Sequence, residues 1–192
     1  QTDVVARPSQ LDGQEIGAVA VDAADGHAFV LYANRLNSNT TEAVVGALHI
    51  VHIETQVPVG YLALPTNTAA WDIVVEGNYA YLAGGSSGLF VVDVSDKANP
   101  AMGQIVAPDP ALDDVLPDAS TIAASFGELA INGSVLVAGT EGGGEVFDLT
   151  NPVSPSSTGT FFSTHPNDIE IDSRPIDSVQ TTVIFIADQS SG

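Results

Sequence analysis

Cysteine is absent from the 192 residues, and only four residues are basic against 24 acidic ones. Without cysteine the chain has no disulfide, no thiolate metal ligand and no cysteine nucleophile. The basic residues are scattered along the sequence as Arg7, Arg35, Lys97 and Arg174. Nucleic acids and anionic membrane surfaces are bound through clustered lysine and arginine, so this distribution argues against both kinds of partner.

Long apolar runs are missing as well, and no segment approaches the roughly 18 residues of a membrane-spanning helix. No signal-peptide pattern stands at the start, and the sequence begins at Gln1 without a methionine. We therefore expect no membrane insertion, and either an exported protein with a mature end left by signal cleavage or a fragment.

What the sequence does contain is enough apolar material to fold. Hydrophobic residues make up 44% and charged residues 15%, which is outside the composition of disordered chains. The length suits one domain or a large part of one. The formal net charge of −20 favours solubility and attracts cations. It fits either a saline habitat or a specific cationic ligand such as calcium.

A repeated unit organises the chain. Its clearest copy has strand-like segments at 71–76 and 79–83, joined at Gly77-Asn78, then a glycine-rich turn at 84–88 and a third strand at 89–95. Gly-Asn is a dipeptide suited to a tight hairpin turn, and the β-branched and aromatic residues around it favour strands. Each copy therefore predicts consecutive antiparallel strands.

The same order recurs at 127–150, more divergently at 17–53, and in a copy that starts at Asn167 and stops after its second strand. A further strand-like stretch lies after each full copy, at 57–64, 101–107 and 157–163, and residues 2–7 resemble it. Four short strands per unit are typical of a β-propeller blade. We predict an all-β fold with inner strands near 17–22, 71–76, 128–132 and 168–172, and almost no helix.

Residues 72–83 and 88–95 resemble the LVIVD repeat, a propeller-forming repeat of extracellular bacterial and archaeal proteins. The resemblance implies an extracellular or cell-surface protein made of blades with four antiparallel strands. The expected blades span approximately 17–64, 71–107 and 127–163, with a partial blade at 167–192 and residues 1–16 as the outer strand of a neighbouring blade.

The number of blades has two interpretations. A closed ring of four would need the N-terminal strand to help complete the last blade, and one strand position would still be unfilled. We favour a segment of a larger propeller, with the remaining blades on further sequence or on another chain, because natural proteins usually protect their strand edges.

Acidic residues open three of the inner strands, at Asp72, Glu128 and Asp168, whereas the divergent first unit has Ala18. Inner strands line the channel of a propeller, so these carboxylates could meet at one mouth and hold calcium, which takes about six to eight oxygen ligands. Alternatively, each carboxylate accepts backbone N–H bonds from the adjacent loop and joins two blades. Its recurrence in successive units favours the structural role.

The other candidate ligands are weaker. His49 and His52 look like a metal pair, but residues three apart on a strand point to opposite faces. His165 stands in a loop that enters an inner strand, where it could face a ligand or only solvent. Residues 108–118 carry four aspartates without the spacing of a calcium loop, and we expect a solvated acidic loop there.

The glycines at 84, 85 and 88 are interpreted as residues of a hairpin turn, and no phosphate-binding loop with lysine is present, so we assign no catalytic residue and no organic cofactor. The leading hypothesis is an extracellular interaction or scaffold module without intrinsic catalysis, which binds a protein or a polysaccharide at the cell surface. The alternative is a propeller hydrolase or lyase that acts on an extracellular polymer. Such an enzyme would need an asymmetric cluster of histidine, aspartate and arginine at the channel mouth.

Overall fold

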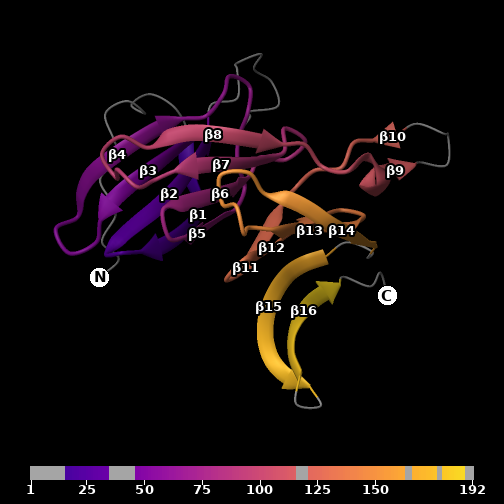
Figure 1. Cartoon of the computed structure of the whole chain (residues 1–192). Helices are drawn as coiled ribbons and strands as arrows, with labels where there is room; N and C mark the ends of the chain where they lie inside the picture. Colours follow the sequence, from indigo (N-terminus) through magenta and orange to yellow (C-terminus); the bar gives the residue numbers. More distant parts are fainter. Residues whose placement is uncertain (1–15, 35–45, 116–120, 163–165, 177–178, 189–192) are drawn as a thin grey trace.

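The computed structural model of this chain describes residues 16–34, 46–115, 121–162, 166–176 and 179–188. These residues form three four-stranded antiparallel sheets and two two-stranded ones (Figure 1). The helical content of this part is a single 3₁₀ turn, η2 (Pro110–Leu112). The predicted all-β architecture of four-stranded antiparallel sheets is confirmed.

Strands pair in chain order within every large sheet. The first sheet contains β1 (Ile16–Ala24), β2 (His27–Asn34), β3 (Gly46–His52) and β4 (Val57–Ala63). The second contains β5 (Ile73–Glu76), β6 (Tyr79–Ala83), β7 (Leu89–Asp93) and β8 (Ala101–Val106). The third contains β11 (Glu128–Asn132), β12 (Val135–Thr140), β13 (Gly143–Asp148) and β14 (Ser156–Phe162). A hairpin of β15 (Pro166–Ile176) and β16 (Val179–Asp188) follows, and β9 (Asp114–Val115) pairs with β10 (Thr121–Ile122).

Two-residue turns join the first two strands of each large sheet. Asp25 and Gly26 both have positive φ, of 52° and 73°, as in the mirror-image turns that match the twist of a hairpin. Gly77 and Gly133 each stand first in their turn with φ of 58°, a conformation that costs glycine little. The tight turn predicted at Gly77-Asn78 is present, and it fixes the register of the strands on either side.

The core lies between successive sheets. Between the first and second sheets it includes Phe29, Leu31, Leu48, Ile50, Ile73, Leu82, Phe90 and Val92. Between the second and third it includes Tyr81, Leu89, Val91, Phe126, Leu129, Leu136 and Phe147. Ala130, Val137, Ile169 and Ile171 join the third sheet to the hairpin. Strand β6 is buried on both faces, because Leu82 faces one cluster and Tyr81 the other, which explains its continuous apolar sequence.

The inner strands contact one another in chain order, β1 with β5, β5 with β11 and β11 with β15. Figure 1 shows the hairpin β15–β16 at the bottom of the view, apart from β1. The described residues therefore form an open series of propeller sheets and do not close a ring. The outer edge of β16 has no neighbouring strand within this part of the chain.

Several details differ from the sequence-based expectation. Strand β5 begins at Ile73, two residues later than expected, and the last hairpin continues until Ile176 pairs with Val179. The acidic insertion is not a plain loop, because it contains η2 and the short pair β9–β10. The expected outer strand at residues 2–7 and the turn at 189–192 lie outside the described residues.

Candidate functional site

The first carboxylate of the predicted set joins two sheets. Asp72 lies immediately before β5, and its Oδ1 accepts a hydrogen bond from the Ile73 N–H at 2.8 Å. Its Oδ2 accepts a second bond, from the Leu129 N–H of β11, at 2.7 Å. Asp72 therefore links the inner strands of the second and third sheets, as in the structural alternative drawn from the sequence.

Glu128, the first residue of β11, lies between the other two acidic residues. Partial burial raises the pKa of its carboxyl above the ordinary value, and the negative charges of Asp72 and Asp168 raise it further. The structure thus places Glu128 near enough to both Asp72 and Asp168 for their charges to act on it. Among the described residues, no three histidine, aspartate or glutamate side chains lie around a common metal position in this arrangement. Calcium binding by these residues remains a prediction.

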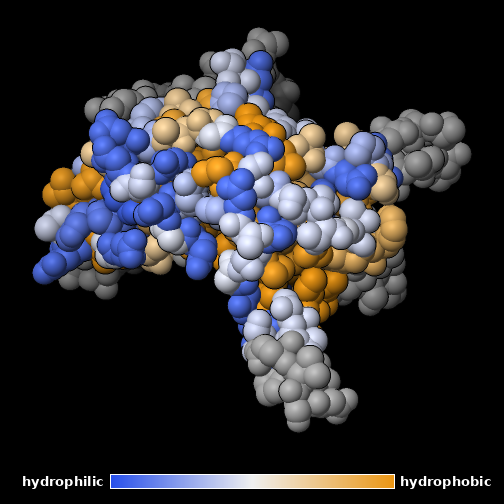
Figure 2. Space-filling model, in the orientation of Figure 1, coloured by the Kyte–Doolittle hydropathy of each residue, from blue (hydrophilic) through white to orange (hydrophobic). Residues whose placement is uncertain are grey.

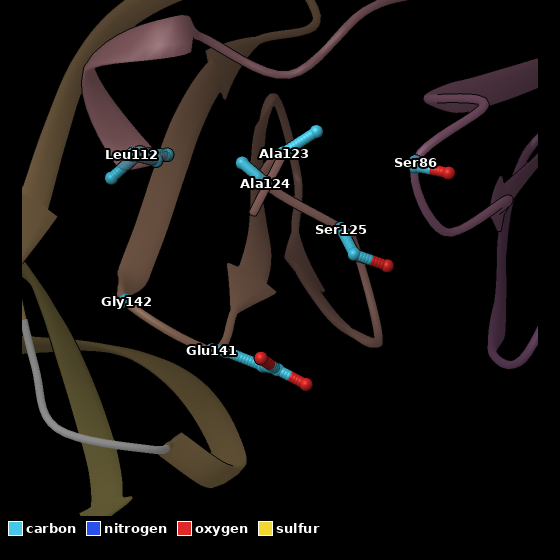
Figure 3. Close-up of a pocket in the computed structure, with 7 residues that line it drawn as sticks. All are labelled: Ser86, Leu112, Ala123, Ala124, Ser125, Glu141 and Gly142. Atoms are coloured by element: carbon cyan, nitrogen blue, oxygen red, sulfur yellow. The ribbon is translucent and has the colours of Figure 1, made fainter. Parts of the chain in front are cut away.

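A pocket of about 380 Å³ lies at the same end of the sheets, between the second and third ones. Its walls come from the β6–β7 turn, the insertion that precedes β11, and the β12–β13 turn. The lining residues are Ser86, Leu112, Ala123, Ala124, Ser125, Glu141 and Gly142. Figure 3 shows the side chains of Ser125 and Glu141 extending in the same direction from neighbouring segments. The pocket combines the Ser125 hydroxyl and the Glu141 carboxylate with an apolar wall, whereas the Ser86 hydroxyl extends away from them.

Hydrogen bonds fix the insertion against the second sheet. Gly85 and Phe126 form a two-way bridge, with N···O distances of 3.1 Å and 3.2 Å. Within the insertion, Asp113 Oδ1 accepts from the Ala124 N–H at 2.9 Å. This aspartate, expected to be solvated, instead closes the insertion upon itself.

A buried carboxylate anchors the other end of the insertion to the third sheet. Glu145 in β13 is only 3% exposed, and its Oε2 accepts from the Asp109 N–H at 3.1 Å. The Asp109 side chain in turn accepts from the Ala111 N–H at 2.8 Å and caps η2. Sequence reasoning placed Glu145 only within a strand. The sequence signal that could have indicated its buried role is a glutamate at an otherwise apolar strand position.

Trp71, the single tryptophan, is 52% exposed beside this pocket. Its backbone N–H donates to Ala83 O at 2.9 Å, which holds it at the end of β6. A Cβ placed on Gly85 would lie 3.4 Å from Trp71 Nε1 and 3.3 Å from Ser125 Oγ. The indole, the Gly85 backbone and the Ser125 hydroxyl therefore lie together. We call this end of the sheets the mouth face, defined by Trp71, Asp72, Ser86, Ser125, Glu128, Glu141 and Asp168.

The histidine pair does not form a metal site. His49 is 2% exposed, and its ring lies between those of Tyr32 and Tyr61, with centroids 5.0 Å and 4.8 Å away. Burial lowers the pKa of His49 below its ordinary value. His52 instead packs against His27 at 5.2 Å. His165 lies outside the described residues.

A comparison with family models matches the second sheet and the residues that lead into it. Residues 68–107 match the LVIVD repeat. This LVIVD repeat includes Trp71, Asp72 and Ser86 of the mouth face, together with strands β5 to β8. The resemblance inferred from the sequence is confirmed for this segment.

Solved structures similar to this chain support the propeller fold. The computationally designed Ika4 protein aligns with a TM-score of 0.55 and 10% identity, over 91% of this chain and 94% of Ika4. The β-propeller domain of Myceliophteria thermophila Cps50 (Swd1) aligns with a TM-score of 0.51 and 11% identity, over 81% of this chain. The chain spans 47% of that domain. At these identities the likeness shows the fold alone.

No curated protein matches the chain. Among the described residues, no helix has the length and apolar character needed to cross a membrane.

Proposed function

We propose that this LVIVD-repeat chain is an extracellular or cell-surface interaction module without intrinsic catalysis, which binds its partner at the mouth face. The observation that carries the proposal is the exposed indole of Trp71 beside the pocket and the carboxylates of the same face. Tryptophan is enriched among the residues that dominate binding energy, because it offers a large, rigid contact area.

Charge favours a basic protein segment as the partner. The net charge of −20 attracts cations over the whole surface. On the mouth face, the charges of Asp72 and Asp168 act on the carboxylate of Glu128, and a bound cation would offset them. A polysaccharide that stacks on Trp71 is the other partner class, and the experiment below distinguishes the two.

The enzyme alternative gains no support from the residues described on the mouth face. They are acidic, hydroxyl-bearing or aromatic, and the described basic side chains are engaged elsewhere. Lys97 donates to Val94 O at 2.9 Å, and Arg174 lies 4.5 Å from the ring centroid of Phe185. The asymmetric cluster of histidine, aspartate and arginine that a hydrolase or lyase would need is therefore not formed by described residues.

We also propose that further blades, on other sequence or on another chain, pack beside β16. Its outer edge is unpaired within the described part, and unprotected edges promote aggregation. Phe162 is 74% exposed and Phe185 is 41% exposed. Figure 2 shows an apolar patch in the lower centre, near the third sheet and the hairpin. A neighbouring blade would cover both the edge and this surface.

The function is tested by replacing the exposed indole. We expect Trp71→Ala to weaken binding of a lysine- and arginine-rich peptide at least tenfold, as for a hot-spot residue. Ile53→Ala is the matched control, because Ile53 is 50% exposed in the turn after β3, at the opposite end of the strands. Isothermal titration calorimetry at physiological salt measures both affinities.

A peptide that binds the Trp71→Ala chain as tightly as the parent chain would contradict the proposed face. Binding of a neutral polysaccharide that depends on Trp71, with no binding of the basic peptide, would keep the face and replace the partner class.

A further inference from the structure

The pocket between the second and third sheets has the composition of a receptor for one cationic side chain. Its volume of about 380 Å³ lies within the range of small-ligand sites. The Glu141 carboxylate and the Ser125 hydroxyl, which extend in the same direction from neighbouring segments (Figure 3), supply hydrogen-bond acceptors on one side of the pocket. Leu112 and the neighbouring alanines supply an apolar wall, against which the methylene stem of a long basic residue can pack.

The pocket is built before any ligand arrives. The Gly85–Phe126 bridge and the Asp113–Ala124 bond hold one wall, and the buried Glu145 holds the start of the insertion. A site whose walls are already ordered loses little conformational entropy on binding. Glu141 itself is exposed at the turn, so its carboxylate can accept a new partner.

The charge of the surroundings selects cations over anions. Glu141 is the one charged residue among those that line the pocket. The described cations are engaged elsewhere, with Lys97 3.9 Å from Asp25 and Arg174 3.6 Å from Asp172. The nearby carboxylates of the mouth face add negative potential, which raises the local concentration of cations.

We propose that this pocket binds the guanidinium group of an arginine presented by the protein partner. The inference rests on the proposed function and specifies where a basic residue of the partner is held. A guanidinium is planar and offers five N–H donors, which suits a carboxylate with a neighbouring hydroxyl better than the point charge of an ammonium. It also stacks on aromatic faces, and Trp71 lies at the rim beside Ser125.

The test uses N-acetyl-arginine amide as the probe and N-acetyl-citrulline amide as its uncharged counterpart, at fixed ionic strength. Titrations are followed through the backbone NMR signals of Ser86, Ser125 and Gly142. We expect the arginine probe to shift these signals and the citrulline probe to bind at least tenfold more weakly. Glu141→Gln should weaken the arginine probe about tenfold, the effect of losing one charge-assisted hydrogen bond.

Glu54→Gln is the matched control, because it removes the same charge from an exposed turn of the first sheet. If Glu54→Gln and Glu141→Gln weaken binding of the arginine probe equally, the loss is an effect of net charge and the inference is overturned. Equal binding of arginine and citrulline probes would overturn it too. The citrulline comparison uses the unmodified chain, so it stays decisive even where Glu141→Gln disturbs folding.

Failure of this inference differs from failure of the proposed function. If the basic peptide binds in a Trp71-dependent way while the arginine probe leaves the three signals unmoved, the interaction module stands and the pocket assignment is wrong. If the arginine probe fills the pocket but no basic peptide binds, the site is a small-cation site and the proposed function is wrong.

Discussion

At the scale of single residues, Asp72 joins two blades through one carboxylate. Its two oxygens accept from Ile73 and Leu129, so the inner strands of the second and third sheets share one hydrogen-bonding group. Asp72→Ala would leave the Leu129 N–H without this partner. Because a hydrogen bond to a charged group contributes about 1.5–3 kcal/mol, we expect the free energy of unfolding to fall by a similar amount.

Urea unfolding followed by tryptophan fluorescence measures this loss. Glu170→Ala serves as the control, since Glu170 is an exposed acidic residue of β15 and its removal changes the net charge equally. If the two variants unfold at the same urea concentration, Asp72 does not act as a joint.

The repeated carboxylates could be predicted from the sequence because the repeat places Asp72, Glu128 and Asp168 at equivalent positions. Their proximity follows from the propeller arrangement, and the charges of Asp72 and Asp168 add to the effect of burial in raising the pKa of Glu128. The buried role of Glu145 could not be predicted. Its hydrogen-bond partner, Asp109, lies 36 residues earlier in a segment that shares no pattern with the repeat.

At the scale of secondary-structure elements, each glycine-rich turn brings two backbones together. Gly143 begins β13 with φ of 148°, and a Cβ there would overlap the carbonyl of Phe161 in β14. Gly88 holds the equivalent place in the second sheet, with φ of 104°, against the carbonyl of Val106. These glycines therefore do more than allow a turn, because they let the third strand approach the fourth.

Gly143→Ala should consequently lower the free energy of unfolding by at least about 2 kcal/mol, from backbone strain and overpacking together. Gly127→Ala is the control, because a Cβ at Gly127 would meet nothing within 4 Å. We expect that variant to stay within about 0.5 kcal/mol of the parent chain. Thermal unfolding of the pair measures the difference, and similar losses in both variants would refute the close-approach argument.

The elements themselves could largely be read from the sequence, because local chemistry determines them. The turns that follow β7 and β13 illustrate this, since Asp93 accepts from the Ser95 N–H and Asp148 from the Thr150 N–H, both at 2.8 Å. The insertion before β11 could not be read in this way. Its shape depends on Gly85 and Glu145, which belong to two different sheets.

At the scale of the whole molecule, the pocket exists only because two blades and an insertion meet. The sequence of each of these three segments predicts only a turn or a loop. No sequence pattern therefore indicated that Ser86, Ser125 and Glu141 would line one cavity. The open series of sheets is likewise a property of the assembled molecule. Within the described part of the chain it leaves the outer edge of β16 unpaired.

The excess of 20 negative charges should make the stability of the whole molecule depend on cations. Mutual repulsion destabilises the compact state, and dissolved salt screens it. We therefore expect the melting temperature of the isolated chain to rise with sodium chloride concentration. A melting temperature that does not respond to salt would refute the repulsion argument.

Calcium at matched ionic strength separates screening from binding. Screening alone predicts no further gain, whereas a carboxylate site gives stabilisation that grows with the logarithm of calcium concentration above its dissociation constant. The mouth face would supply such a site through Asp72, Glu128 and Asp168, because a bound cation would offset the charges of Asp72 and Asp168 that act on Glu128. Thermal unfolding of Glu128→Gln with and without calcium, with Glu54→Gln as the control, shows whether any stabilisation by calcium depends on Glu128. Loss of the calcium response in Glu128→Gln alone would assign the ion to these residues. A parent chain that melts identically with and without millimolar calcium would leave them as joints between blades.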